Sequence, residues 1–405
     1  MEMAQLIQWL WKQEYWLPPG FTWEDMQETE DIRYPQPCHL LLCLPITLLL
    51  VTLQFFFERK IAIPLSKKLG LQEKVRRKPS PYPILEAFYK KWRKSPPKEE
   101  VSSLAKQCDL QPRQVERWFR YRLNQDRPSL TKKFCEVSWR AIYFIISVCA
   151  GWAILYNKPW FWDFRECWVG YPKQPLQLSI FSYFLIQLSF YWSLLIMLPF
   201  DVKQKDFHQQ IVHHLVTIFL IGLSYCVNYI RIGLLMIFLT DCSHCLLEAA
   251  KMFNYLKWQK TCDTLFIAFS AVFLIIHLVI FPSKILHNTW YYFMELYPPF
   301  FGYYFFNTLL IVLQLLHVFW SYLIICMVYR FLIHGTVEKD VRSDPEDSED
   351  KDGDELGQKS ECQAPTSLPN LGGRGEGRNG CGNGVDRILI APVIRPTAAC
   401  SSVRV

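Results

Sequence analysis

The chain has 405 residues, of which 51% are hydrophobic and 16% aromatic, while 20% are charged and the formal net charge is +7. This composition excludes a wholly disordered chain and a small disulfide-rich scaffold, and several long apolar runs exclude an ordinary soluble protein. A run of ~20 apolar residues crosses the hydrocarbon core of a bilayer. We therefore expect an all-α polytopic membrane protein with about seven transmembrane helices, near residues 38–57, 137–156, 179–198, 209–229, 232–250, 263–281 and 303–330.

The first segment, residues 1–37, precedes the first expected span at 38–57. It lacks the basic start and the small-residue cleavage site of a signal peptide. Its aromatic residues indicate either a short segment lying at the membrane interface or an aromatic lead-in to the first span. These aromatic residues include Trp9, Trp11, Tyr15 and Trp16.

The orientation of the chain follows from its basic residues. Between Glu58 and Glu136 there are 21 basic and 9 acidic residues. The positive-inside rule places this segment in the cytosol, which puts the N-terminus in the lumen and the C-terminus in the cytosol. The fourteen cysteines show no pattern of a disulfide framework.

The cytosolic insert, residues 66–130, predicts three short helices at 81–93, 97–107 and 111–125. Val115, Trp118 and Phe119 give the third helix one apolar face. This helix resembles the recognition helix of a homeodomain, whose pattern is W-F-x-N-x-R. Here Tyr121 stands in place of the Asn that reads adenine, and Leu123 stands in place of the final Arg. Sequence-specific DNA binding is therefore not expected, because it relies on that Asn. The basic residues of the insert are expected to face anionic lipid headgroups or simply water.

Titratable residues gather in two neighbouring spans, in FHQQIVHH (207–214) and FLTDCSHCLLE (238–248). An ionisable side chain inside a span costs roughly 2.5–3.5 kcal/mol, so such a cluster indicates a function. The short connection between the spans makes them antiparallel neighbours, with these groups in the cytosolic half. The residues of the cluster are His213 and His214 on one span and, on one face of the next, Asp241, His244, Glu248 and Lys251.

A histidine beside a carboxylate can act as a general base or as a transient acyl acceptor. We expect Asp241 to hold one imidazole in the required tautomer. A coenzyme A or nucleotide headgroup stays in water whereas an acyl chain enters lipid, so a site at this boundary can meet the reactive carbonyl. Lys203, Lys205 and Lys251 are candidate contacts for coenzyme A phosphates, or ordinary solvated lysines at the membrane edge.

Two other interpretations of this cluster remain open. Buried polar pairs can hold helices together in a membrane. The spacing H-x-x-x-x-H-H also resembles part of a metal-binding histidine box. The chain has only nine histidines, however, and C-S-H-C at 242–245 lacks a partner pair for zinc, so no metal is expected.

Three features near the last span have plainer interpretations. His317 is expected to be a satisfied core histidine, and Tyr303 to Phe306 a packed aromatic belt. Pro298 and Pro299 are expected to break the chain before the last span.

The tail, residues 336–405, is acidic at first and then rich in Gly, Pro and Ser. It cannot bury a core and is expected to be disordered. Ser343 and Ser348 lie beside acidic residues and suit an acid-directed kinase, although a plain solvated tail has the same composition.

Five blocks carry a resemblance to a known family: QPRQVERWFRYRLNQDRPSL (111–130), QLSFYWSLL (187–195), DVKQKDFHQQIVHHLVTI (201–218), LLEAAKMFNY (246–255) and ELYPPFFGYYFFN (295–307). With these blocks the chain resembles a ceramide synthase.

The resemblance implies transfer of an acyl group from fatty acyl-CoA to the amine of sphinganine or sphingosine, in the endoplasmic reticulum membrane. It implies a six-helix TLC-type domain at 131–335, a homeobox-like insert, homo- or heterodimers and no cofactor beyond the acyl-CoA substrate. It assigns catalysis to His213, His214 and Asp241, with His244 and Glu248 as candidate supporting residues.

One part of the motif departs from the family. Relatives read H-D-x-x-D, and this chain reads T-D-C-S-H, so Thr240 replaces a histidine and His244 an aspartate. Either the enzyme is active with an altered pH dependence, or it is an impaired membrane regulator or scaffold. The resemblance also places acyl-length selection in a loop at 282–302 and the start of the last span, with long to very long chains expected.

Overall fold

The computed structural model describes residues 5, 8–29, 32–71, 76–92, 95–202 and 206–334. Every regular element in these residues is a helix, as the sequence predicts. The tail with Ser343 and Ser348, and the two lysines Lys203 and Lys205, lie outside them.

Seven helices in the described residues are long and apolar enough to cross a membrane, which confirms the predicted number of spans. Each of the seven contains most of one predicted apolar run. They cover Pro37–Lys68, Pro112–Leu155, Leu178–Met197, Phe207–Cys226, Ile230–Tyr255, Gln259–Leu296 and Phe301–Ile333.

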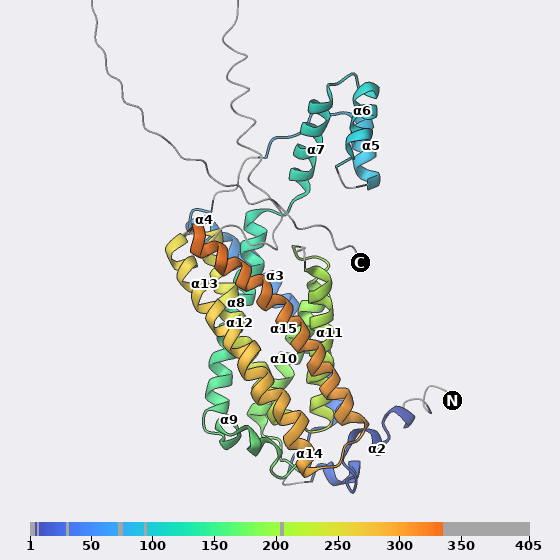
Figure 1. Cartoon of the computed structure of the whole chain (residues 1–405), viewed down its shortest axis with the longest axis vertical. Coiled ribbons are helices and arrows are strands. Elements are labelled where there is room, and N and C mark those ends of the chain that lie inside the picture. Colours follow the sequence, from blue (N-terminus) through green and yellow to red (C-terminus); the bar gives the residue numbers. More distant parts are fainter. Residues whose placement is uncertain are drawn as a thin grey trace, which may run out of the picture. The chain divides into compact units, whose positions relative to one another are not determined.

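The helices pack side by side into a bundle whose axis runs along them (Figure 1). Neighbouring contacts join α12 to α8 and α13, α10 to α3 and α11, and α15 to α11 and to the helix after α13. Apolar side chains cover the outside as well as the inside, because lipid replaces water around a spanning helix. The main helices are α3 (Cys43–Phe57), α8 (Leu130–Leu155), α10 (Leu178–Met197), α11 (Phe207–Cys226), α12 (Ile230–Tyr255), α13 (Gln259–Leu274) and α15 (Phe301–His334).

The chain alternates between two ends of this bundle. One end, here called the α14 end, holds the connections from α8 to α10, α11 to α12 and α14 to α15, together with the N-terminal segment. The other, the α4 end, holds the connections from α10 to α11 and α12 to α13. The shorter elements are α2 (Gln13–Trp16), η1 (Trp23–Met26), η2 (Pro37–Leu42), η3 (Glu58–Ala62), α4 (Ile63–Lys68), α9 (Pro159–Trp162) and η4 (Phe164–Trp168).

The tight connection between α11 and α12 depends on Asn228, whose φ is +60°. Asn tolerates this left-handed conformation better than most residues, and it ends α11 as a C-terminal cap. Its side-chain amide donates to the carbonyls of Pro172 at 2.6 Å and Gln174 at 2.9 Å. These bonds tie the turn to the connection between α8 and α10. The two helices that the turn joins are antiparallel neighbours, as the short connection predicts.

The helix after α12 corrects one prediction. It continues from α13 through η5 (Ile275–Leu286), η6 (Asn288–Tyr292) and α14 (Phe293–Leu296), so most of the predicted 282–302 loop is helical. Pro282 lies inside η5, where the wider π-helical turn accommodates a residue that cannot donate a backbone hydrogen bond. The chain breaks only at 297–300, which confirms the effect predicted for Pro298 and Pro299.

The insert contains the three predicted helices: α5 (Pro83–Trp92), α6 (Lys98–Gln107) and α7 (Pro112–Asp126). Val115, Trp118 and Phe119 are buried in its own apolar core, as the face of the third helix predicts. The Trp118 indole N–H donates to the Ser80 carbonyl at 2.6 Å, so the ring is both packed and satisfied. The arrangement is a small helical unit with its own core.

Candidate functional site

Three of the predicted histidines meet inside the bundle. His213 and His214 lie on α11 with ring centroids 5.5 Å apart, and His244 on α12 lies 6.3 Å from His213. His213 is 7% exposed. The Nδ1 atoms of all three rings are buried and have no hydrogen-bond partner in the described residues. Buried polar atoms are normally paired, so each of these nitrogens retains an unused hydrogen-bonding position.

Trp320 of α15 packs against His213. The two rings meet edge to face at 5.4 Å. The Trp320 indole N–H donates to Asp206 Oδ2 at 3.0 Å, immediately before α11 begins. The sequence analysis did not find this residue, because nothing in an apolar helix indicates which distant carboxylate an indole meets.

Asp241 has partners other than the predicted imidazole. It is fully buried on α12, and its Oδ2 accepts from the Ser147 hydroxyl and the Gln187 amide, both at 2.5 Å. Its Oδ1 has no hydrogen-bond partner. The expected contact with a histidine is therefore wrong in this structure, because Asp241 points toward α8 and α10 while His213 and His214 approach from α11.

Two tyrosines extend this polar network. The Tyr143 hydroxyl donates to Gln187 Oε1 at 2.9 Å, and the Tyr183 hydroxyl lies 3.1 Å from the Ser147 hydroxyl. Gln187 also donates to the Ser147 hydroxyl. Asp241 thus anchors α12 to α8 and α10, and this fixes the part of α12 that carries His244.

Glu248 and Lys251 belong to a separate ion-pair network toward the α4 end. The Arg140 guanidinium of α8 lies 3.2 Å from Glu248 and 3.2 Å from Asp201, and Lys251 lies 3.0 Å from Glu248. Burial raises the pKa of the Asp201 carboxyl, and Arg140 opposes that rise. Glu248 lies between two cations, and Lys251 pairs with it. The supporting role of Glu248 and the phosphate contact of Lys251 stay predictions.

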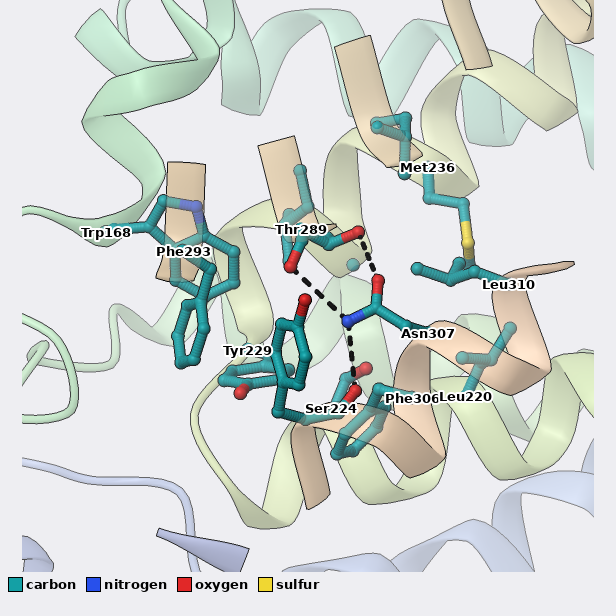
Figure 2. Close-up of a pocket in the computed structure, with 14 residues that line it drawn as sticks. Trp168, Leu220, Ser224, Tyr229, Met236, Thr289, Phe293, Phe306, Asn307 and Leu310 are labelled. Carbon is teal, nitrogen blue, oxygen red and sulfur yellow. Dashed lines mark hydrogen bonds between the residues drawn. The ribbon is translucent and has the colours of Figure 1, made fainter. Parts of the chain in front are cut away.

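A cavity lies between the histidines and the α14 end, among α11, α12, α15 and the helix 275–296. The space between its wall atoms is about 430 Å³, which includes space open to the surroundings, and the volume comparable to that of an enclosed cavity is about 30 Å³. Its wall is mostly apolar and aromatic (Figure 2). The lining residues are Trp168, Leu220, Ser224, Tyr229, Ile232, Gly233, Met236, Ile285, Thr289, Phe293, Tyr303, Phe306, Asn307 and Leu310.

One buried polar pair crosses this cavity wall. Thr289 Oγ1 lies 2.9 Å from Asn307 Oδ1, and the Asn307 amide donates to the Tyr303 carbonyl at 2.9 Å (Figure 2). Tyr303 and Phe306 line the cavity while Tyr304 is exposed, so the predicted aromatic belt is partly a cavity wall.

The cavity and the histidines lie along the same two helices, α11 and α15. On α11 the lining residues Ser224 and Leu220 are followed, one helical turn at a time, by Thr217 and His213. On α15 Leu310 is followed by Gln314 and His317. The nearest lining residues of the cavity therefore lie about two helical turns from His213 and His317, along the same inward faces.

His317 departs from its prediction. It is buried, with its ring centroid 4.3 Å from that of His277, but its Nδ1 has no hydrogen-bond partner. It is therefore not the satisfied core histidine that was expected. Within the described residues, no group of three or more His, Cys, Asp or Glu side chains is placed to hold a metal ion.

The chain is similar to two known domain families and to known ceramide synthases. The TLC domain family matches residues 133–326, and the homeodomain family matches residues 73–127. Ceramide synthase 4 of Bos taurus is 47% identical over 87% of this chain and 89% of its own length. Human ceramide synthase 4 is 46% identical over 91% of this chain and 92% of its own length. Human ceramide synthase 3 is 45% identical over 84% of this chain and 88% of its own length.

Proposed function

The chain belongs to the ceramide synthase family, and from this premise we propose that it is an acyl-CoA-dependent N-acyltransferase. It transfers a long or very long fatty acyl group to the amine of sphinganine or sphingosine and releases coenzyme A. The observation that carries this proposal is the pair His213, which is buried, and His214, which is half-buried, whose Nδ1 atoms have no partner and which lie about two helical turns from an apolar cavity.

The imidazoles account for both steps of an acyl transfer. In one route an imidazole nitrogen attacks the thioester carbonyl, the carbon–sulfur bond breaks and coenzyme A leaves as its thiol. The amine then attacks the acyl-imidazole, loses a proton and forms the amide. In the other route the imidazole takes the proton of the amine while that amine attacks the thioester directly. Intact mass after incubation with acyl-CoA alone separates the routes, because only the first leaves an acylated chain.

Asp241 acts in this proposal by position and charge. Its bonds to Ser147 and Gln187 hold α12 against α8 and α10, and this sets His244 beside His213. The buried carboxylate also favours positive charge nearby, which stabilises an imidazole that takes a proton.

The cavity is the proposed place for the acyl chain. Its wall is apolar, and it follows the inward faces of α11 and α15 away from the histidines. A chain attached at His213 thus finds lipid-like surroundings along its length, while coenzyme A stays at the water boundary. Each additional buried methylene contributes ~0.8 kcal/mol, so the depth of this cavity selects chain length gradually.

The membrane placement completes the proposal. The chain is a multi-pass membrane protein. We place it in the endoplasmic reticulum with the α14 end facing the lumen, because the basic insert follows the first span. Assembly with a second copy or a related synthase belongs to the same proposal.

A second candidate is a membrane regulator that has lost catalysis. It follows from Thr240, whose hydroxyl donates to the Met236 carbonyl of its own helix at 2.8 Å, and from the replacement of an acid by His244. The Thr240 contact is purely local, so it supplies no group to the site. His244, in contrast, places a third imidazole in it.

The deciding experiment uses microsomes from cells without endogenous ceramide synthases, which express this chain and receive sphinganine with acyl-CoAs of graded length. The enzyme proposal predicts amide product with at least one chain length. If the expressed chain forms no product with any of them, the regulator remains and the enzyme proposal fails.

A further inference from the structure

The N-terminal segment packs against the start of the last helix. Trp16 of α2 meets three rings of α15 edge to face, Phe301 at 5.9 Å, Phe305 at 5.7 Å and Phe306 at 6.4 Å. Tyr15 also meets Phe301 at 5.9 Å. Figure 1 shows α2 beside the beginning of α15, at the α14 end.

This approach is close enough to require a glycine. A Cβ added to Gly302 would lie 2.9 Å from the backbone carbonyl of Tyr15. Any larger residue there would push α2 away from α15. The backbones of α2 and α15 therefore approach each other closely at Tyr15 and Gly302. This close approach fixes the position of the neighbouring Trp16.

The segment is held in place by its own bonds as well. The Trp16 indole donates to the Leu10 carbonyl at 2.6 Å, and the Trp23 indole donates to the Trp11 carbonyl at 3.0 Å. Trp16 is 8% exposed. Farther along the segment, Asp25 lies 2.9 Å from Lys173, in the connection between α8 and α10. With these contacts the described residues 8–29 form a cap on the α14 end of the bundle.

Phe306 links this cap to the cavity. Its ring lines the cavity and also faces Trp16. Phe306 is 4% exposed, so it has little room to move while Trp16 is present. The indole thus packs against a ring of the cavity wall, in the part of the cavity nearer the α14 end than the histidines.

We propose that the N-terminal segment sets the maximum acyl length, because Trp16 holds Phe306 against the end of the cavity. This inference rests on the proposed function, and it assigns to α2 a part in chain selection that the sequence analysis gave only to residues 282–302 and the start of the last span. Removing the indole gives Phe306 space to withdraw, and the cavity then accepts a longer chain.

The expected size of the effect follows from the burial of methylenes. One methylene changes selection by about fourfold, so two additional carbons change it by about fifteenfold. The Trp16→Ala variant should therefore raise the yield from an acyl chain two carbons longer than the wild-type optimum by about fifteenfold, relative to the yield from that optimum.

The test measures product profiles in the same microsomes with a series of saturated acyl-CoAs. Trp9→Ala is the matched control, because Trp9 belongs to the same segment, is 52% exposed and contacts Tyr15 but no ring of α15. The proposal expects a profile shifted toward longer chains for Trp16→Ala and an unchanged profile for Trp9→Ala. An unchanged profile for Trp16→Ala would overturn it.

A second variant tests the proposal if the Trp16→Ala protein does not fold and so does not accumulate in the microsomes. Phe306→Leu replaces the ring by a smaller side chain and so enlarges the cavity directly. It should shift the product profile in the same direction. In the double variant the Trp16 substitution should add little, because both changes act through one ring. Fully additive shifts, or no shift with Phe306→Leu, would contradict the proposal. Wild-type microsomes without any product would instead count against the proposed function.

Discussion

Arg140 offers the sharpest test of how the bundle is held together. Its side chain is 18% exposed and lies between Glu248, at 7%, and Asp201, at 12%. Replacing it by Met keeps most of the volume and removes the charge. Glu248 keeps Lys251 as a partner, but Asp201 loses its ion pair.

Breaking a buried ion pair by removing one partner costs about 3–5 kcal/mol, because a buried charge is left uncompensated. Arg140→Met should therefore lower the free energy of unfolding by about 3 kcal/mol, the lower bound, since only one of the two carboxylates is stranded. Adding Asp201→Asn removes the stranded charge and should recover part of that loss.

The assay is unfolding of the purified protein in mixed micelles by titration with dodecyl sulfate. Arg330→Met is the matched control, because Arg330 is exposed and its loss changes the net charge equally. If Arg140→Met were as stable as this control, or if Asp201→Asn gave no recovery in the double variant, the network would not have the stabilising role inferred from its geometry.

Two further predictions concern groups with defined partners. Gln187→Leu removes one of the two donors to Asp241, and it should cost about 1.5–3 kcal/mol of stability by the same titration, whereas Gln187→Glu should cost more because it adds a second buried carboxylate. In the insert, donation from Arg122 lowers the pKa of Glu86, so this pair stabilises the fold above the unfolded pKa of about 4.3 and the contribution is lost as the pH falls. Circular dichroism of segment 66–130, which has its own core, should show an acid-dependent loss of roughly 0.2–1 kcal/mol that Glu86→Gln abolishes. An identical acid transition in that variant would refute the assignment.

The spans and the histidine pair were predictable, because both are local. An apolar run of sufficient length identifies a spanning helix by itself, and adjacent polar residues within it are unusual enough to indicate a site. The break after Leu296 was also local, since it depends on Pro298 and Pro299. Pro282 shows the limit, because the same residue type lies inside a helix there.

The partners of the charged residues could not be predicted. Ser147 and Asp241 are 94 residues apart, and Arg140 and Glu248 are 108 residues apart. Spacing along one helix shows which residues share a face but not which neighbouring helix that face meets. In a helix that is apolar all round, the pattern does not distinguish the lipid side from the bundle side. Asp241 was therefore assigned to the wrong partner.

The central claim is that the imidazoles of His213 and His214 on α11 perform the acyl transfer. Its most direct test compares amide formation by His213→Ala and by His208→Ala in microsomes without other ceramide synthases. Both histidines lie on α11, but His208 is exposed and His213 is buried beside His244 and Trp320. The account predicts a loss of at least 100-fold for His213→Ala, the scale of removing a general base, and near wild-type activity for His208→Ala. Equal activity of the two variants at equal expression would contradict it.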